Sequence, residues 1–438
     1  MAESLKVLFV PFGPDIGHVN VSIGVAEVLL SAGHRPIFLI DSHWKARLRD
    51  YGIDSCDIND DSMEDKQNMD TNHVKELSTQ MVRTGGIGPK TALQKVVNRG
   101  RVAADWMHRA IKLDKLLVTL LPSIAPNLII AEQLLSIPAI ELSGIPYVWL
   151  SGSNHLGMCN DNRLPPSTSG LSATDVKEWQ IFRDVRNRAV NEVWIQCNDY
   201  VISRGCQPLK ENEFANNDKC LNIYGCPLEL DYHDLRPLPK NYIRFDNLMR
   251  IEKKIQFEIP VELRDRPGKL VYFSLGSMGA ADVDNMKRLV NILSKSKHRF
   301  IVSKGPLYDE YSLADNMWGE GSVPQIQVLP LVDLVITHGG NNTVTETFHF
   351  GKPMIVLPLF GDQWDNAQRV HEKGFGIRLD AYKCSEEELL NAIESLLNNK
   401  ELNEKLMKIS HRIQSDNSIA KLPEIIEDFI QNPQKYKF

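Results

Sequence analysis

Residues 335–363 concentrate groups that could bind a phosphate and a sugar. An apolar run ends at Thr337, His-Gly-Gly follows, and a helix is predicted to begin at Asn341. The first backbone N–H groups of such a helix have no partner, and the helix dipole places partial positive charge there, which favours a bound phosphate. The polar groups of this stretch that could take part are those of His338, Gly340, Asn342, Thr343, Glu346, Asp362 and Gln363.

A second apolar run, residues 354–357, follows the predicted helix and precedes Asp362. Two apolar runs joined by a helix predict parallel strands, and open α/β sheets bind ligands at the carboxyl ends of such strands. The polar residues should therefore share one edge of a sheet. For His-Gly-Gly-Asn alone, an ordinary β–α–β unit whose residues cap a helix is an equally good explanation.

The complete string resembles the nucleotide-sugar signature of the family 1 UDP-glycosyltransferases. It contains Thr-His-x-Gly, then Asn-Thr, a Glu three residues later, a Pro seven residues after that, and a closing Asp-Gln. The resemblance implies the GT-B fold, an α/β architecture of two Rossmann-like domains facing a cleft, and a UDP-sugar as donor co-substrate. It also implies that Ser277, His338, Asn342 and Thr343 hold the diphosphate, Glu346 the ribose, and Asp362 with Gln363 the sugar hydroxyls.

The first half of the chain should supply a general base for the acceptor hydroxyl. His18 follows an apolar run and a glycine-containing loop, and it matches the position of the family's catalytic histidine. A neutral imidazole suits proton abstraction near pH 7, and a carboxylate on its other nitrogen would fix the tautomer. The family usually has Asp after the strand at residues 127–131, where this chain has Glu132. The longer side chain could keep this pair or lose it, leaving Glu132 as a structural acid and His18 as a helix cap.

Many members of the family have Trp-x-Pro-Gln upstream of the signature, with the indole stacked on the uracil. The Pro-Gln pair is present here, but Ser322 takes the place of the tryptophan. The backbone of Val323 and the side chain of Gln325 are expected to bind the base and ribose. Trp318 or Met317 could cover the base instead, and the choice between UDP and dTDP stays open.

The 438-residue chain is long enough for two large domains or three ordinary ones. Apolar runs typical of buried parallel strands recur in both halves, and residues 231–264, rich in charge and proline, are interpreted as a linker between them. We predict an acceptor-binding domain over residues 1–245 and a nucleotide-sugar-binding domain over residues 246–414. Helices over residues 415–438 should pack back on the first domain.

Composition and the chain ends predict a cytoplasmic protein with no membrane partner. The net charge of −6 argues against a surface for nucleic acid or anionic membranes. Residues 1–6 do not read as a signal peptide, and no run of about 18 apolar residues occurs. In these respects the chain resembles the soluble bacterial and mite branch of the family, rather than animal members with a signal peptide and membrane anchor. The seven cysteines, odd in number and without a CxxC pair, indicate reduced thiols.

No metal or other cofactor is predicted. Asp282 and Asp284 form an Asp-x-Asp pair, but they stand at a predicted helix start, where aspartate is a common cap. Aromatic residues of the first half could line a pocket for the acceptor, although most of them are expected in the core. These residues are Phe12, Trp106, Trp149, Trp179 and Phe182.

The expected function is inverting, metal-independent transfer of a sugar, glucose in the first instance, from a UDP-sugar to a hydroxyl of a small lipophilic acceptor. A flavonoid, a macrolide or another xenobiotic would fit, which suggests detoxification. The alternatives are a bacterial-type natural-product glycosyltransferase using a dTDP-sugar, a UDP-sugar epimerase on the same fold, and a non-catalytic partner subunit. The His18 loop favours a transferase over an epimerase, and intact Asp362 and Gln363 argue against a non-catalytic subunit.

Overall fold

The computed structural model describes residues 4–13, 16–58, 69–159, 161–252 and 256–436, with the side chains of residues 69–73 excepted. Residues 1–3, at the start of the chain, and Pro14 and Asp15, in the loop before His18, lie outside the described residues.

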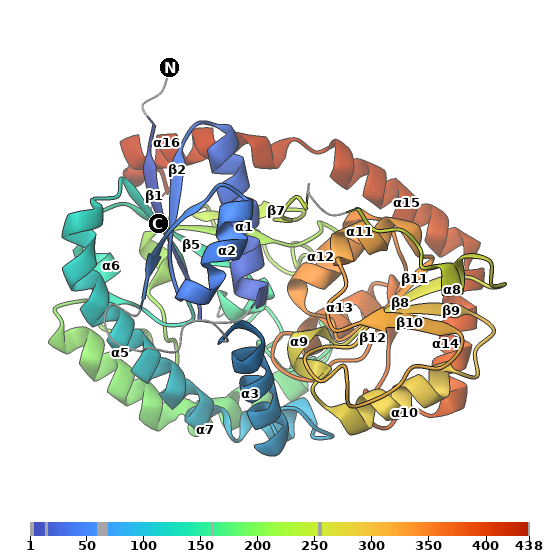
Figure 1. Cartoon of the computed structure of the whole chain (residues 1–438). Coiled ribbons are helices and arrows are strands. Elements are labelled where there is room, and N and C mark those ends of the chain that lie inside the picture. The colour runs from blue at the N-terminus through green and yellow to red at the C-terminus, as the bar shows by residue number, and fades with distance from the viewer. Residues whose placement is uncertain (1–3, 14–15, 59–68, 160, 253–255, 437–438) are drawn as a thin grey trace.

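The chain forms two parallel β-sheets, one in each half, as predicted from its apolar runs (Figure 1). The first has the order β3-β2-β1-β4-β5-β6-β7 and the second the order β10-β9-β8-β11-β12-β13. The first sheet consists of β1 (Lys6–Pro11), β2 (Arg35–Ile40), β3 (Asp54–Asp57), β4 (Leu128–Glu132), β5 (Tyr147–Ser151), β6 (Leu221–Gly225) and β7 (Tyr242–Phe245). The second consists of β8 (Leu270–Ser274), β9 (Arg299–Ser303), β10 (Met317–Glu320), β11 (Leu334–Thr337), β12 (Met354–Val356) and β13 (Gly376–Arg378).

Helices cover both faces of each sheet, because parallel strands are joined by crossover connections. Those of the first half are α1 (Ile16–Ser31), α2 (Lys45–Asp50), α3 (Met69–Arg83), α4 (Ala92–Val96), α5 (Arg99–Ile124), α6 (Pro138–Leu142) and α7 (Val176–Ser203). Those of the second half are α8 (Val261–Arg264), α9 (Gly276–Gly279), α10 (Val283–Leu293), α11 (Gln325–Val328), α12 (Asn341–His349), α13 (Gln363–Glu372), α14 (Glu386–Asn398), α15 (Lys400–Ser415) and α16 (Leu422–Gln431).

Strand β1 shows why the apolar runs are continuous rather than alternating. Val7 and Phe9 enter the core that α1 and α16 cover, whereas Leu8 and Val10 enter the core beneath α5 and α6. All four side chains are fully buried. Because successive side chains of a strand point to opposite faces, a strand covered on both sides must be apolar throughout.

The end of the chain returns to the first domain. Helices α15 and α16 run along one side of the molecule from the second domain to the first (Figure 1). Leu422, Ile426 and Phe429 of α16 are buried in the core of the first sheet together with residues of α1. The last helix therefore ties the two halves together.

The interpretation of residues 231–264 as a linker is wrong for residues 242–245. These residues form β7, which pairs with β6 in parallel, with Tyr242 opposite Asn222. The strand is only four residues long and lies at the edge of the sheet, where proline before a strand is tolerated. The charged and proline-rich residues around it therefore gave no sign of a strand in the sequence. The connection between the domains begins only after Phe245.

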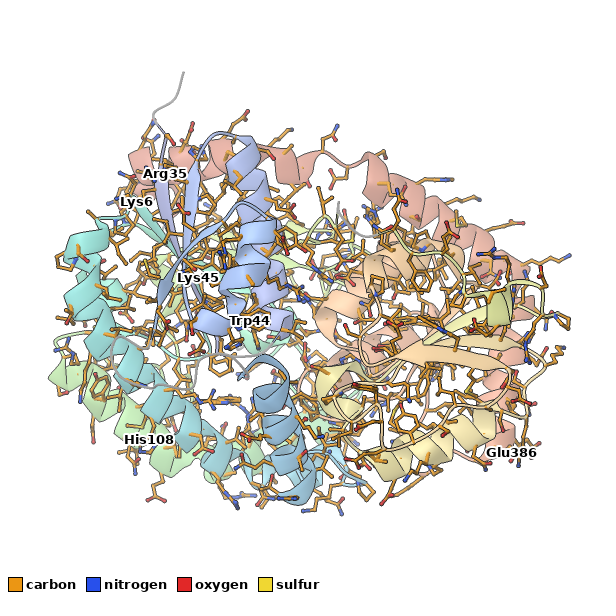
Figure 2. The ribbon with its side chains drawn as sticks, viewed as in Figure 1. Lys6, Arg35, Trp44, Lys45, His108 and Glu386 are labelled. Carbon is orange, nitrogen blue, oxygen red and sulfur yellow. The ribbon has the colours of Figure 1, made fainter. Side chains whose placement is uncertain are left out.

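In each sheet the strand order reverses beside the first strand, at β1/β4 and at β8/β11. Such a reversal opens a ligand-binding crevice beyond the carboxyl ends of the two strands. In Figure 2, Lys6 and Arg35 mark the amino ends of β1 and β2, and Trp44, after the carboxyl end of β2, lies nearer the centre of the molecule. The two carboxyl edges meet, since the Asn342 amide donates to the carbonyl oxygen of Gly17 (2.8 Å).

Candidate active site

His18 and Glu132 form a pair at the reversal point of the first sheet. Glu132 is the last residue of β4, in register with Pro11 of β1, and His18 lies in the first turn of α1. His18 Nδ1 lies 2.5 Å from Glu132 Oε1. The carboxylate also accepts the backbone N–H groups of Phe12 and Gly152, each at 3.1 Å. The longer glutamate side chain therefore reaches the histidine without loss of the pair.

This geometry assigns the two ring nitrogens different tasks. The Glu132 side chain is 4% exposed and that of His18 is 17% exposed, so the carboxylate is enclosed while part of the ring reaches solvent. A carboxylate bonded to Nδ1 holds the tautomer in which Nδ1 carries the proton and Nε2 accepts one. The Phe12 ring packs edge-on against the imidazole at 5.3 Å, which further fixes its orientation.

Gly152 leaves the space that the pair needs. A Cβ atom at this position would lie 2.9 Å from Val21 Cγ1, 3.0 Å from Glu132 Oε1 and 3.4 Å from His18 Nδ1. The loop after β5 therefore approaches the pair more closely than any other residue type would allow.

We expect Gly152→Ala to lower turnover by about 10²-fold, because a displacement of about 1 Å in a catalytic group has effects of that size. Gly157→Ala is the matched control, since a Cβ there would meet nothing closer than 3.8 Å. Steady-state rates of both variants check the prediction. Unchanged turnover in Gly152→Ala would show that the loop can move away without disturbing the pair.

The residues predicted to hold the diphosphate lie at the reversal point of the second sheet. His338 follows β11, Gly340 precedes the first turn of α12, and Ser277 lies in α9, after the neighbouring strand β8. The His338 ring lies over Gly276, where a Cβ would be 2.8 Å from Cε1 and Nε2. Burial lowers the pKa of His338 to about 4, so the ring is neutral at pH 7. It can offer a diphosphate an N–H donor, while the favourable electrostatic potential comes from the helix N-terminus.

Two asparagines at the start of α12 bridge the domains. Asn341 Nδ2 donates to the carbonyl oxygen of Gly225 (3.2 Å), and Asn342 Nδ2 donates to that of Gly17 (2.8 Å). Gly17 directly precedes His18. Asn342, which is predicted to hold the diphosphate, therefore also contacts the first turn of α1, which carries the candidate base.

The residues expected to bind base and ribose form a hydrogen-bonded cluster. Gln325 Nε2 donates to Glu346 Oε2 (2.5 Å) and to Thr343 Oγ1 (3.2 Å). Arg250 Nη1 donates to Glu346 Oε1 at 3.1 Å. Burial raises the pKa of Glu346, against the opposing effect of the Arg250 guanidinium. Val323, two residues before Gln325, is buried.

Asp362 and Gln363 stand at the start of α13, across from the candidate base. Asp362 Oδ2 accepts the backbone N–H of Asn154 (2.8 Å), which follows β5 of the first domain. Burial raises the pKa of Asp362, and the nearby His18 counteracts that rise. Gln363 Oε1 accepts the N–H groups of Leu359 and Phe360 (3.0 and 3.1 Å), which fixes the orientation of its side-chain amide.

The aromatic residues separate into two groups. Trp149, Trp179 and Phe182 are 3–6% exposed and belong to the interior. Phe12 and Trp106 are half-buried and pack edge to face at 5.9 Å beside His18. The apolar surface next to the candidate base therefore comes from these two rings.

Ser322, which stands at the position of the family's stacking tryptophan, is exposed. Met317 is buried in the core, and the Trp318 ring packs against Phe257 with centroids 5.8 Å apart. Both side chains thus contribute to the packing of β10, contrary to the expectation that one of them covers the base.

Asp282 caps α10, its Oδ1 accepting the N–H of Asn285 (3.2 Å), as expected for this Asp-x-Asp pair. Within the described ranges no group of three or more His, Cys, Asp or Glu side chains is placed to hold a metal ion. The seven cysteines are free thiols, and all but Cys56 are buried. None of the helices that the structure describes is long and apolar enough to cross a membrane.

The whole architecture matches solved glycosyltransferases. The glycotransferase of kitacinnamycin has a TM-score of 0.69 at 16% identity, covering 98% of this chain and 99% of that chain. Spinosyn rhamnosyltransferase SpnG complexed with thymidine diphosphate has a TM-score of 0.64 at 19% identity, covering 97% and 100%. The two domains thus define a GT-B fold.

Sequence comparison finds a family profile that matches part of the chain. The profile, described as UDP-glucoronosyl and UDP-glucosyl transferase, matches residues 262–425. UDP-glucuronosyltransferase 1A9 of Homo sapiens is 32% identical over 245 residues, covering 55% of this chain and 40% of that protein. UDP-glucuronosyltransferase 1A7 of Homo sapiens is 32% identical over 159 residues, covering 36% and 30%. The chain therefore spans less than half the length of these relatives. The family profile thus matches the second domain and the start of the helices that return to the first, and it is there that the chain is similar to the UDP-glucuronosyl and UDP-glucosyl transferases.

Proposed function

We propose that the protein transfers a sugar, in the first instance glucose, from a UDP-sugar to a hydroxyl of a small lipophilic acceptor. The transfer would invert the anomeric carbon and need no metal ion. The observation that carries the proposal is the His18–Glu132 pair (2.5 Å), placed at the domain interface within electrostatic reach of Asp362. The half-buried rings of Phe12 and Trp106 beside the pair support an apolar acceptor such as a flavonoid or a macrolide.

In this reaction the acceptor oxygen bonds to the anomeric carbon while the bond from that carbon to the diphosphate oxygen breaks. The acceptor proton passes to His18 Nε2, and the electron pair of the broken bond leaves with UDP. Glu132 stabilises the imidazolium that forms. The first turn of α12 stabilises the departing diphosphate, and Asp362 and Gln363 orient the sugar hydroxyls.

A dTDP-sugar donor is the second candidate. Ser322 leaves the base without the stacking indole of many relatives, and two solved neighbours are complexes with thymidine diphosphate, SpnG and the glycosyltransferase VinC. Equal concentrations of UDP-glucose and dTDP-glucose in competition would decide between the donors. We propose UDP-glucose as the preferred one.

We also propose that the reaction serves detoxification of xenobiotics in the cytoplasm. The seven free thiols fit a reducing compartment.

The proposed function is tested with UDP-glucose and a panel of phenolic and macrolide acceptors, by UDP release and mass spectrometry. We expect acceptor-dependent UDP release and a product heavier by one hexose. Conversion of UDP-glucose into another UDP-sugar without an acceptor would identify an epimerase instead. Binding of UDP without either reaction would identify a non-catalytic subunit.

Turnover should be unchanged in EDTA, because the helix N-terminus and neutral hydrogen-bond donors replace a cation at the diphosphate. Rates are compared with EDTA, with no addition, and with Mg²⁺ or Mn²⁺ added back. Loss of activity in EDTA that either ion restores would contradict the metal-independent mechanism.

A further inference from the structure

Tyr308 is an exposed aromatic residue on the loop that follows β9. Its side chain is 53% exposed, whereas Leu307 and Tyr311 on the same loop are 7% and 6% exposed. The two buried residues anchor the loop on either side of the exposed ring. Because the loop is anchored on both sides, the Tyr308 ring presents a flat apolar surface at a fixed position.

Hydrogen bonds fasten this loop to its neighbour after β10. The N–H of Lys304 donates to the carbonyl oxygen of Glu320 (2.8 Å), and that of Gly305 to Gly321 (3.0 Å). Lys304 Nζ then closes the loop by donating to the carbonyl oxygen of Tyr311 (2.9 Å). The segment therefore continues the β9–β10 pairing past the carboxyl edge of the sheet.

Two close approaches place the loop between the segments predicted to bind the nucleotide. A Cβ on Gly321 would lie 2.8 Å from Tyr308 Cδ1, so the ring lies against the backbone immediately before Ser322. A Cβ on Gly305 would lie 2.4 Å from the Cβ of Ala280, which directly follows α9 and its Ser277.

We propose that Tyr308 is the platform on which the nucleobase of the donor stacks; this inference rests on the proposed nucleotide-sugar transfer. Pyrimidine bases stack on aromatic side chains because both present flat π-faces, and the interaction tolerates different bases. Ser322, Val323 and Gln325 then meet the polar edge of the base and the ribose. Tyr308, on the loop after β9, would thereby stack on the base in place of the tryptophan that many relatives have at the position of Ser322.

The test measures the affinities of UDP and of inorganic pyrophosphate, which has no base, by titration calorimetry. Tyr308→Ala should weaken UDP binding about tenfold or more, and Tyr308→Phe should stay within about twofold, because the ring makes the contact. Pyrophosphate should bind all variants equally. Leu331→Ala is the matched control, because Leu331 is also exposed (41%) but precedes the amino end of β11, at the opposite edge of the sheet. In the Tyr308→Ala background, Ser322→Trp should restore UDP affinity.

Wild-type protein that does not bind UDP would overturn the proposed function and this inference with it. Wild-type protein that binds UDP no more tightly than Tyr308→Ala does would overturn this inference alone. An equal loss of pyrophosphate affinity in Tyr308→Ala would also overturn it, because the loop as a whole would then have collapsed.

Discussion

Replacement of His18 by alanine is expected to lower turnover by about 10²–10⁴-fold, the usual contribution of a general base. The affinity for UDP should stay within a few-fold, because the residues expected to hold the nucleotide lie in the second domain. The histidine is held by Glu132 at 2.5 Å and packs against Phe12, so its removal leaves no other imidazole in that position. The measurements are the steady-state rate and the dissociation constant of UDP.

His108→Ala is the matched control for this variant. His108 lies on the exposed side of α5, where its Nδ1 bonds to the carbonyl oxygen of Ala104 in the same helix (2.8 Å). A His18→Ala enzyme that retains a tenth of the wild-type rate would contradict the assignment of the base. Glu132→Ala should also lower turnover steeply, whereas Glu132→Asp should be milder, because aspartate can keep the charge near the ring. Unchanged pH–rate profiles in both Glu132 variants would make Glu132 a structural residue.

Much of the site could be predicted because its residues follow strand ends that are visible in the sequence. An apolar run that is buried on both faces has no polar residue to interrupt it, so its end is sharp. His338 directly follows one such strand, and Glu132 is the last residue of another. The order of the strands in each sheet then brings these ends together. The alternation of strands and helices therefore predicted the two parallel sheets and the sheet edges at which Glu132 and His338 lie.

The remaining residues depend on contacts between segments far apart in the chain, which no local pattern encodes. Asn154 meets Asp362 across 208 positions, and Asn342 meets Gly17 across 325. The run Ser-Gly-Ser-Asn after β5 carried a signal for Asn154, because small polar residues after a buried strand are typical of a site. Arg250 lay inside a segment whose charge and proline content indicated only a linker, so its partner could not be predicted.

Arg250 forms ion pairs with two largely buried acidic side chains between the domains. Its Nη1 donates to Glu346 (3.1 Å) and its Nη2 to Glu252 (2.6 Å). The side chains of Arg250 and Glu346 are 8% and 2% exposed. Removal of the arginine would leave Glu346 with a buried charge and, among the described side chains, with the amide of Gln325 as its remaining close partner. Loss of one member of a buried pair costs about 3–5 kcal/mol, several times the value of an ion pair at the surface.

We therefore expect Arg250→Leu to lower the free energy of unfolding by about 3–5 kcal/mol. Arg264→Leu, in the same connecting segment, removes the exposed ion pair with Glu258 and should cost less than about 1 kcal/mol. Urea denaturation of the two variants provides the comparison. Adding Glu346→Gln to Arg250→Leu should recover part of the loss, because the buried site then carries no unpaired charge at position 346. Equal stability of Arg250→Leu and Arg264→Leu would contradict this prediction. It would show that water reaches Glu346 and that its pair with Arg250 does not fasten the connecting segment to α12.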